Sequence, residues 1–130
     1  MEVVILLLQT MLIPIPAPMK ANSRVQDLKK RLDWGEPALT IIDVRNHDSF
    51  NTSHITGAVP IPLSQLVEQA LVNLELVRDI YVYGSSDEET ALAATLLKEA
   101  GYQNVAQLLG GLAAWKAAGY PIEDNAAIIA

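Results

Sequence analysis

Three acidic residues stand in a short polar loop that directly follows an apolar run. The run covers residues 79–83 and reads DIYVY, and the loop covers residues 84–90 and reads GSSDEET. A loop between a buried strand and a helix can present a nucleophile or hold an anion on backbone N–H groups. Gly84 offers no nucleophile, and Asp87, Glu88 and Glu89 would repel an anion. The loop therefore lacks both of the features that such loops use.

Ser85 and Ser86 are the candidate nucleophiles inside this loop. A serine nucleophile needs a base within hydrogen-bond reach, and nothing in the sequence supplies one, so we interpret these serines as cap and turn residues. A metal site at the three acids is a second alternative. Adjacent acids are common at the start of a helix, and a metal site needs ligands from other segments as well. We expect no metal and no catalytic residue in the loop, which ends at Thr90.

Asp43, Arg45 and His54 are the other residues that could carry chemistry. Asp43 lies near the end of the β-branched run at 38–44 and Arg45 directly after it, so the two could form a catalytic pair. A histidine titrates near neutrality and could serve as a base. We interpret Asp43 and Arg45 instead as a structural ion pair that fixes the end of a strand. His54 we expect to bond to the backbone at the edge of a second strand.

Composition limits the chemistry further. The chain has 130 residues, a net charge of −6, a pI of about 4.7, two histidines and no cysteine. A length of this order suits one domain, and the acidic balance argues against nucleic acid as a partner. The lack of cysteine excludes persulfide and thioester chemistry and thiolate metal ligands. We expect no cofactor and a cytoplasmic location, with which a chain lacking disulfides is compatible.

Strand and helix patterns alternate along the chain. Apolar runs at 38–44, 57–62, 79–83 and 104–109 predict strands, whereas residues 22–32, 63–77, 86–100 and 110–118 show helical spacing. We interpret residues 119–124 as a turn. The alternation predicts an α/β fold with a central, mainly parallel sheet flanked by helices on both faces. Function in such sheets lies at the carboxyl ends of the strands, where Asp43 and Gly84 stand.

Three helix signals fix the expected helix ends and faces. Ser23 with Gln26, and Ser86 with Glu89, have the spacing of a capping box. Gly101 is placed to end the helix that Ser86 begins. The inner face of that helix is expected to consist of Leu92, Ala93, Leu96 and Leu97.

Residues 1–21 form a hydrophobic, proline-rich segment. Gln9, Thr10 and several prolines interrupt it, so it does not read as a spanning helix. It could be an extra strand or docked tail, a mobile tail, coding sequence upstream of a true start at Met19, or, least favoured, a weak membrane segment over residues 3–13. We expect a folded domain over residues 22–123, a tail over 124–130, and a fold that does not need the residues before Met19.

Several landmarks in order resemble the rhodanese homology domain over about Ser23 to Glu123. The residues that carry the resemblance are Asp43-Val44-Arg45, His54-Ile55, Gly57-Ala58, Gly101-Tyr102, Asn104-Val105, Gly110-Gly111, Trp115 and Gly119-Tyr120-Pro121. The resemblance implies a single rhodanese-like domain in which Asp43, Arg45, His54, Gly57, Gly110, Gly111 and Trp115 are structural positions. It also implies sulfur-transfer chemistry by a cysteine directly after the central strand, and Gly84 stands at that position.

We therefore predict a catalytically inactive rhodanese-like domain, a pseudoenzyme with a binding or regulatory role. The degenerate loop at 84–90 would be its recognition surface, and its partner a protein or basic peptide rather than a nucleic acid. Two alternatives stay open: a small enzyme with non-cysteine chemistry at the same crevice, and an adaptor that associates through the hydrophobic N-terminal segment.

Overall fold

The computed structural model of the chain describes residues 18–35 and 38–124. Within those two ranges, no helix is long and apolar enough to cross a membrane. The predictions about residues 1–17, including the extra strand and the weak membrane segment, concern residues outside the described part of the chain.

Strands and helices alternate along most of the described chain, as the sequence predicts. In order they are β1 (Asn22–Ser23), α2 (Val25–Trp34), β2 (Leu39–Asp43), α3 (His47–Thr52), β3 (Ser53–Ile55), β4 (Val59–Pro60), the 3₁₀ turn η1 (Leu63–Gln65), α4 (Leu66–Asn73), β5 (Asp79–Tyr83), α5 (Asp87–Glu99), β6 (Asn104–Leu108), α6 (Gly111–Ala117) and β7 (Ile122–Asp124).

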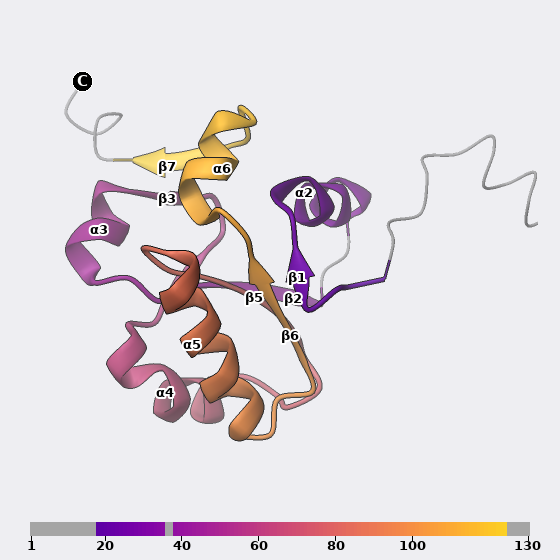
Figure 1. Cartoon of the computed structure of the whole chain (residues 1–130), viewed down its shortest axis with the longest axis vertical. Helices are drawn as coiled ribbons and strands as arrows, with labels where there is room; N and C mark the ends of the chain where they lie inside the picture. The colour runs from indigo at the N-terminus through magenta and orange to yellow at the C-terminus, as the bar shows by residue number, and fades with distance from the viewer. Residues whose placement is uncertain (1–17, 36–37, 125–130) are drawn as a thin grey trace, which may run out of the picture.

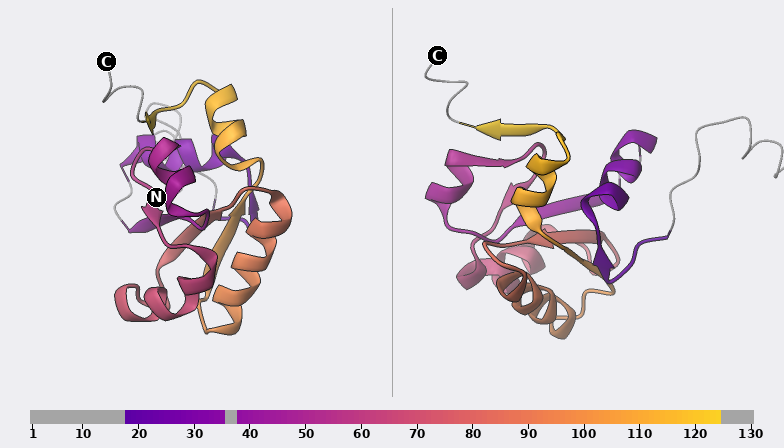
Figure 2. Two further views of the ribbon diagram at one scale, coloured as in Figure 1. Left: turned by 90° about the vertical axis from the view of Figure 1, so that its left-hand side faces the viewer. Right: turned by 45° about the horizontal axis from the view of Figure 1, so that its top comes forward.

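A five-stranded sheet with the order β1-β6-β5-β2-β4 forms the centre of the domain, and all of its pairs are parallel. Helices α4 and α5 cover one face of this sheet, and α2 and α6 lie on the other (Figures 1 and 2). Four of the five residues in both β2 and β5 are buried, which explains their nearly continuous apolar runs. The predicted α/β class with a mainly parallel sheet is confirmed.

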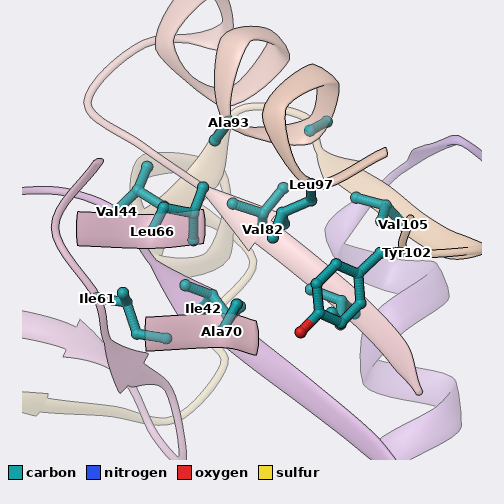
Figure 3. Close-up of a cluster of buried hydrophobic side chains, with 12 residues drawn as sticks. Ile42, Val44, Ile61, Leu66, Ala70, Val82, Ala93, Leu97, Tyr102 and Val105 are labelled. Atoms are coloured by element: carbon teal, nitrogen blue, oxygen red, sulfur yellow. The ribbon is translucent and has the colours of Figure 1, made fainter. Parts of the chain in front are cut away.

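Two clusters of buried side chains form the core, one on each face of the sheet. On the α4–α5 face, Ile42 and Val82 from the sheet pack with Leu66 and Leu97 from the helices (Figure 3). On the α2–α6 face, Leu28, Tyr81 and Trp115 belong to the second cluster. All seven of these side chains are at most 1% exposed, so both faces of the central strands are fully covered.

The inner face of α5 is rotated from the one that the sequence predicts. Leu92 is 51% exposed, whereas Ala93, Ala94 and Leu97 are buried together with Thr90. These four buried positions recur every three to four residues and so form one stripe along the helix. The predicted end of the helix is confirmed, because Gly101 has a φ of +109° and Tyr102 N donates to Leu97 O at 3.1 Å.

The predicted capping box at Ser23 is wrong. Ser23 lies in β1, pairs with Leu108 of β6, and its hydroxyl donates to Lys20 O at 2.8 Å. The cap is at Arg24, whose backbone N donates to the Asp27 carboxylate at 3.0 Å. Pairing with the sheet therefore shifts the helix start by one residue. Local residue spacing cannot predict this shift, because it depends on a strand that is distant in the sequence.

The predicted turn at 119–124 is also incomplete, because its second half is the strand β7. β7 pairs antiparallel with β3 in a separate two-stranded sheet that joins His54 to Glu123. Both strands have three residues, too few for alternation to be recognised. β7 extends to Asp124, one residue past the predicted domain limit.

Candidate functional site

Residues 84–90, hereafter the Gly84 loop, connect the end of β5 to the start of α5. Asp43, the last residue of β2, pairs with Tyr83, the last residue of β5. Because parallel strands end at the same edge, Asp43 and Gly84 lie close together at the carboxyl edge of the sheet. The structure therefore places both predicted site segments where the sequence places them.

Hydrogen bonds from within the loop hold its shape. Gly84 N donates to the Thr90 hydroxyl at 2.8 Å, and that hydroxyl donates to Ser86 O at 3.0 Å. Ser86 is the N-cap of α5, with its hydroxyl accepting from Glu89 N at 3.1 Å. The predicted cap at Ser86 is confirmed, and the Thr90 side chain ties the loop to the end of β5.

The Glu89 side chain bends back over Gly84. Its carboxylate accepts from Ser85 N at 3.0 Å, instead of from Ser86 N as a complete capping box would require. A Cβ placed on Gly84 would lie 2.6 Å from Glu89 Oε1 and 2.9 Å from Glu89 Cγ, well inside the about 3.5–4.0 Å of ordinary carbon contacts. Glu89 therefore occupies the space that a side chain at position 84 would use.

The start of α6 closes against the same loop. Gly110 N donates to the Asp87 carboxylate at 3.0 Å. Gly111 has a φ of +50°, and a Cβ on it would lie 3.4 Å from Gly84 O, so its missing side chain permits the close approach. Two of the three loop acids thus accept backbone N–H groups. Glu88, the third, is exposed and makes no ion pair or hydrogen bond with the described residues.

Asp43 and Arg45 form an ion pair at the end of β2. Arg45 Nη2 lies 2.7 Å from Asp43 Oδ2, and Arg45 Nε lies 3.0 Å from Asp43 Oδ1. The Asp43 side chain is fully buried and the Arg45 side chain is 12% exposed. Arg45 Nη2 also donates to Ser53 O at 2.7 Å. The guanidinium therefore joins the end of β2 to the start of β3 and does not face the Gly84 loop as a free cation.

Tyr83 is a site residue that the sequence analysis did not single out. Its hydroxyl accepts from Ile55 N at 3.1 Å, and its ring lies 5.6 Å from the Arg45 guanidinium carbon. Burial raises the pKa of the Tyr83 phenol far above its ordinary value, and the Asp43 carboxylate raises it further. Tyr83 is therefore a neutral link between β5 and β3. Its place directly before Gly84 was the only signal in the sequence.

His54 does not face the loop. Its Nδ1 lies 2.8 Å from Phe50 O, its Nε2 lies 3.2 Å from Glu123 Oε2, and its ring stacks on Phe50 at 3.7 Å. His54 bonds to backbone, as expected, but it does so from β3 in the small antiparallel sheet and not from the edge of the main sheet. No base among residues 18–35 and 38–124 hydrogen-bonds to the Ser85 or Ser86 hydroxyl.

A metal site finds no support in the geometry of the described residues. Across that part of the chain, no three histidine, aspartate or glutamate side chains come together in an arrangement that could hold an ion. Asp87 and Glu89 already accept backbone N–H groups on different sides of the loop.

Residues 24–118 match the family model for the rhodanese-like domain. The chain belongs to the rhodanese-like domain family. The solution structure of the rhodanese-like domain of the Anabaena sp. Alr3790 protein has a TM-score of 0.78 and 52% sequence identity, and the match covers 82% of this chain and 80% of that one. The crystal structure of thiosulfate sulfurtransferase from Pseudomonas aeruginosa has a TM-score of 0.74 and 30% identity, and the match covers 81% of this chain and 20% of that one.

A relative named as a regulator shares the rhodanese-like domain. The HTH-type transcriptional regulator Rv0324 from Mycobacterium tuberculosis is 32% identical over 114 residues, which is 86% of this chain and 48% of that protein. This chain therefore spans about half the length of that relative, and the match by itself gives no function to this rhodanese-like domain.

Two of the remaining rhodanese motif positions, Gly57 and Trp115, have structural roles outside the Gly84 loop. Gly57 has a φ of +88° in the turn between β3 and β4, where Ala58 N donates to Ile55 O at 2.9 Å. Trp115 is 1% exposed, and its Nε1 donates to Pro121 O at 2.7 Å. The first contact closes the turn between β3 and β4, the second ties α6 to the segment before β7, and neither involves the Gly84 loop.

The purified rhodanese-like domain is expected to form no thiocyanate from thiosulfate and cyanide. Gly84 stands where the family resemblance implies the sulfur-bearing cysteine, and the chain contains no cysteine elsewhere. No side chain can therefore carry sulfur as a persulfide. The measurement is colorimetric thiocyanate production at saturating thiosulfate and cyanide. Turnover above that of heat-killed protein would contradict this prediction.

Proposed function

We propose that this chain is a catalytically inactive rhodanese-like domain with a binding or regulatory role. The observation that carries the proposal is the Glu89 carboxylate, which accepts Ser85 N and fills the space beside Gly84. In an active rhodanese loop, the backbone N–H at position 85 would bind the anion, and the space beside position 84 would hold the side chain that carries sulfur. In this chain the Glu89 carboxylate accepts that N–H and fills that space. The absence of cysteine supports the same conclusion.

We further propose that the mouth of the Gly84 loop binds a basic protein segment. The loop carries three acidic residues, Asp87, Glu88 and Glu89, and Asp87 and Glu88 are exposed. The positive end of the α5 dipole is already matched by these acids, which leaves little attraction for an oxyanion. A lysine- or arginine-rich peptide is the complementary partner. We place this role in the cytoplasm, because the chain needs no oxidising compartment to fold.

Titration with a lysine- and arginine-rich peptide is expected to shift the amide signals of the Gly84 loop, whereas thiosulfate, sulfate and phosphate leave them in place. Binding should weaken strongly as salt is raised, because the screening length falls from about 10 Å at 0.1 M to about 3 Å at 1 M. Glu88→Gln should lower the affinity by about two- to fivefold, the value of one exposed charge pair. The measurement is two-dimensional NMR of the isotope-enriched protein, in which the amide signals are followed.

Glu99→Gln is the matched control for this titration. Glu99 is an exposed acid at the opposite end of the same helix, about 20 Å from the loop. Its substitution changes the net charge equally but should leave the affinity unchanged. Equal weakening by both substitutions would indicate nonspecific attraction to the acidic protein. Loop shifts caused by the anions and not by the peptide would reject the proposed recognition.

A further inference from the structure

The amino ends of the strands carry an apolar surface that the rhodanese-like site does not use. Leu71, Val72, Leu76 and Val77, hereafter the amino-end patch, are 51%, 79%, 43% and 58% exposed. All four fall within seven consecutive residues, at the end of α4 and in the turn that leads into β5. The other large exposed apolar residues of the described chain, including Val59 and Leu92, are single in the sequence.

Hydrogen bonds to backbone carbonyls hold the turn of the amino-end patch in place. Gln103 N donates to Leu76 O at 3.0 Å, and the Asn104 side chain donates to Val77 O at 2.9 Å. Tyr102 Oη donates to Leu74 O at 2.8 Å in the same turn. The turn is therefore fixed to the start of β6, and its apolar side chains are held outward on an ordered segment. Clustered exposed apolar side chains of this kind commonly mark a contact surface.

The chain itself contains a segment that suits this surface. Residues 3–8 read VVILLL and carry no charge, and the only charged residue before Lys20 is Glu2. We propose that residues 3–8 of the same chain cover the amino-end patch. This inference does not depend on what the Gly84 loop binds.

The described chain begins within reach of the amino-end patch. Asn22 and Ser23 of β1 pair with Gln107 and Leu108, the last two residues of β6, and Gln107 pairs with Val82 of β5. Val77 precedes Val82 by five residues, so the patch lies about 16 Å further toward the amino edge. β1 and β5 are two strand positions apart, or about 10 Å. Residues 9–17, which link residues 3–8 to Pro18, can span up to about 33 Å, so the patch is within reach.

The tether favours this segment over a second copy of the chain. A segment on a short linker is present at an effective concentration in the millimolar range, about a thousandfold above that of a second molecule at micromolar concentration. A modest apolar contact is then enough to keep the patch covered within one molecule.

The test uses a nitroxide spin label on Leu6→Cys in the full chain. Because the natural sequence has no cysteine, the label attaches at one position only. We expect the amide signals of Val72, Leu76 and Val77 to lose most of their intensity, relative to the sample with reduced nitroxide. The signal of Ser85, at the opposite edge of the sheet, should be unchanged.

Two variants of the labelled chain test the surface itself. Val72→Ser with Val77→Ser changes only exposed positions and should restore the remaining patch signals. Leu92→Ser, also at an exposed apolar position, should leave the broadening in place.

Three results would overturn the inference. The first is a patch whose signals stay sharp in the labelled chain. The second is equal broadening in a mixture of spin-labelled and isotope-enriched molecules, which would assign the contact to a second copy. The third is sharp patch signals together with sedimentation of the full chain on phosphatidylcholine vesicles, which would assign residues 3–8 to a lipid surface.

Discussion

Gly84→Cys alone is expected to give little or no sulfur transfer from thiosulfate, whereas Gly84→Cys combined with Glu89→Ala is expected to be at least about tenfold faster. Gly84 does not have a positive φ, so its backbone accepts a side chain. The obstacle is Glu89, whose carboxylate oxygen would lie 2.6 Å from the new Cβ. A cysteine alone must therefore displace Glu89 from Ser85 N or be distorted itself.

The charge of Glu89, like its volume, is expected to slow sulfur transfer by the Gly84→Cys variant. A carboxylate beside the new thiol would raise the thiol pKa and reduce the thiolate that attacks the donor. It would also repel the thiosulfate dianion, by about 1 kcal/mol per charge pair at 4 Å in water and about 4 kcal/mol at an effective dielectric constant of 20. A difference of about 1.4 kcal/mol is tenfold in rate, so removal of one carboxylate is enough for the expected gain.

Gly84→Cys with Glu88→Ala is the matched control for this experiment. It removes a carboxylate from the same loop but leaves Glu89 over position 84. Thiocyanate formation should stay close to that of Gly84→Cys alone. Equal activation by the two double variants would show that the total loop charge matters and that the position of Glu89 does not. A fast single Gly84→Cys variant would contradict both explanations.

Arg45→Met is expected to lower the free energy of unfolding by about 3–5 kcal/mol. Its guanidinium is the ion-pair partner of the fully buried Asp43 carboxylate and also donates to Ser53 O. The variant would leave a buried charge without its cation and a carbonyl without its donor. The measurement is chemical denaturation followed by circular dichroism, with the wild-type chain as reference.

Two further variants identify the cause of that loss. Arg24→Met removes an arginine whose side chain is 71% exposed, and it should change stability by no more than about 0.5 kcal/mol. Asp43→Asn combined with Arg45→Met should be less unstable than Arg45→Met alone, because the unpaired buried charge is gone. If the double variant were less stable than the single one by the full cost of Asp43→Asn, the pair would not be coupled.

Sequence patterns were sufficient for four of the five strands of the central sheet and for the place of Asp43 and Gly84 at its carboxyl edge. The runs at β2 and β5 belong to central strands covered on both faces, and four of the five residues in each are buried, so neither run shows the polar alternation of a half-exposed strand. Asp43 ends β2 and Gly84 directly follows β5, and parallel pairing then brings them to one edge. Short-range signals also succeeded at Ser86 and Gly101, because caps depend on residues three to five positions apart.

The amino-acid sequence by itself determined the chemistry that this protein lacks, since a chain without cysteine has no sulfur carrier whatever its fold. Only the tertiary structure decided what the three loop acids do. Asp87 accepts Gly110 N from a segment 23 residues away, and Glu89 turns back onto Ser85 N and the empty side of Gly84. The pairing of β3 with β7 across 69 residues was likewise invisible. Local residue spacing cannot predict these contacts, because side-chain rotamers and long-range partners depend on the space available in the folded protein.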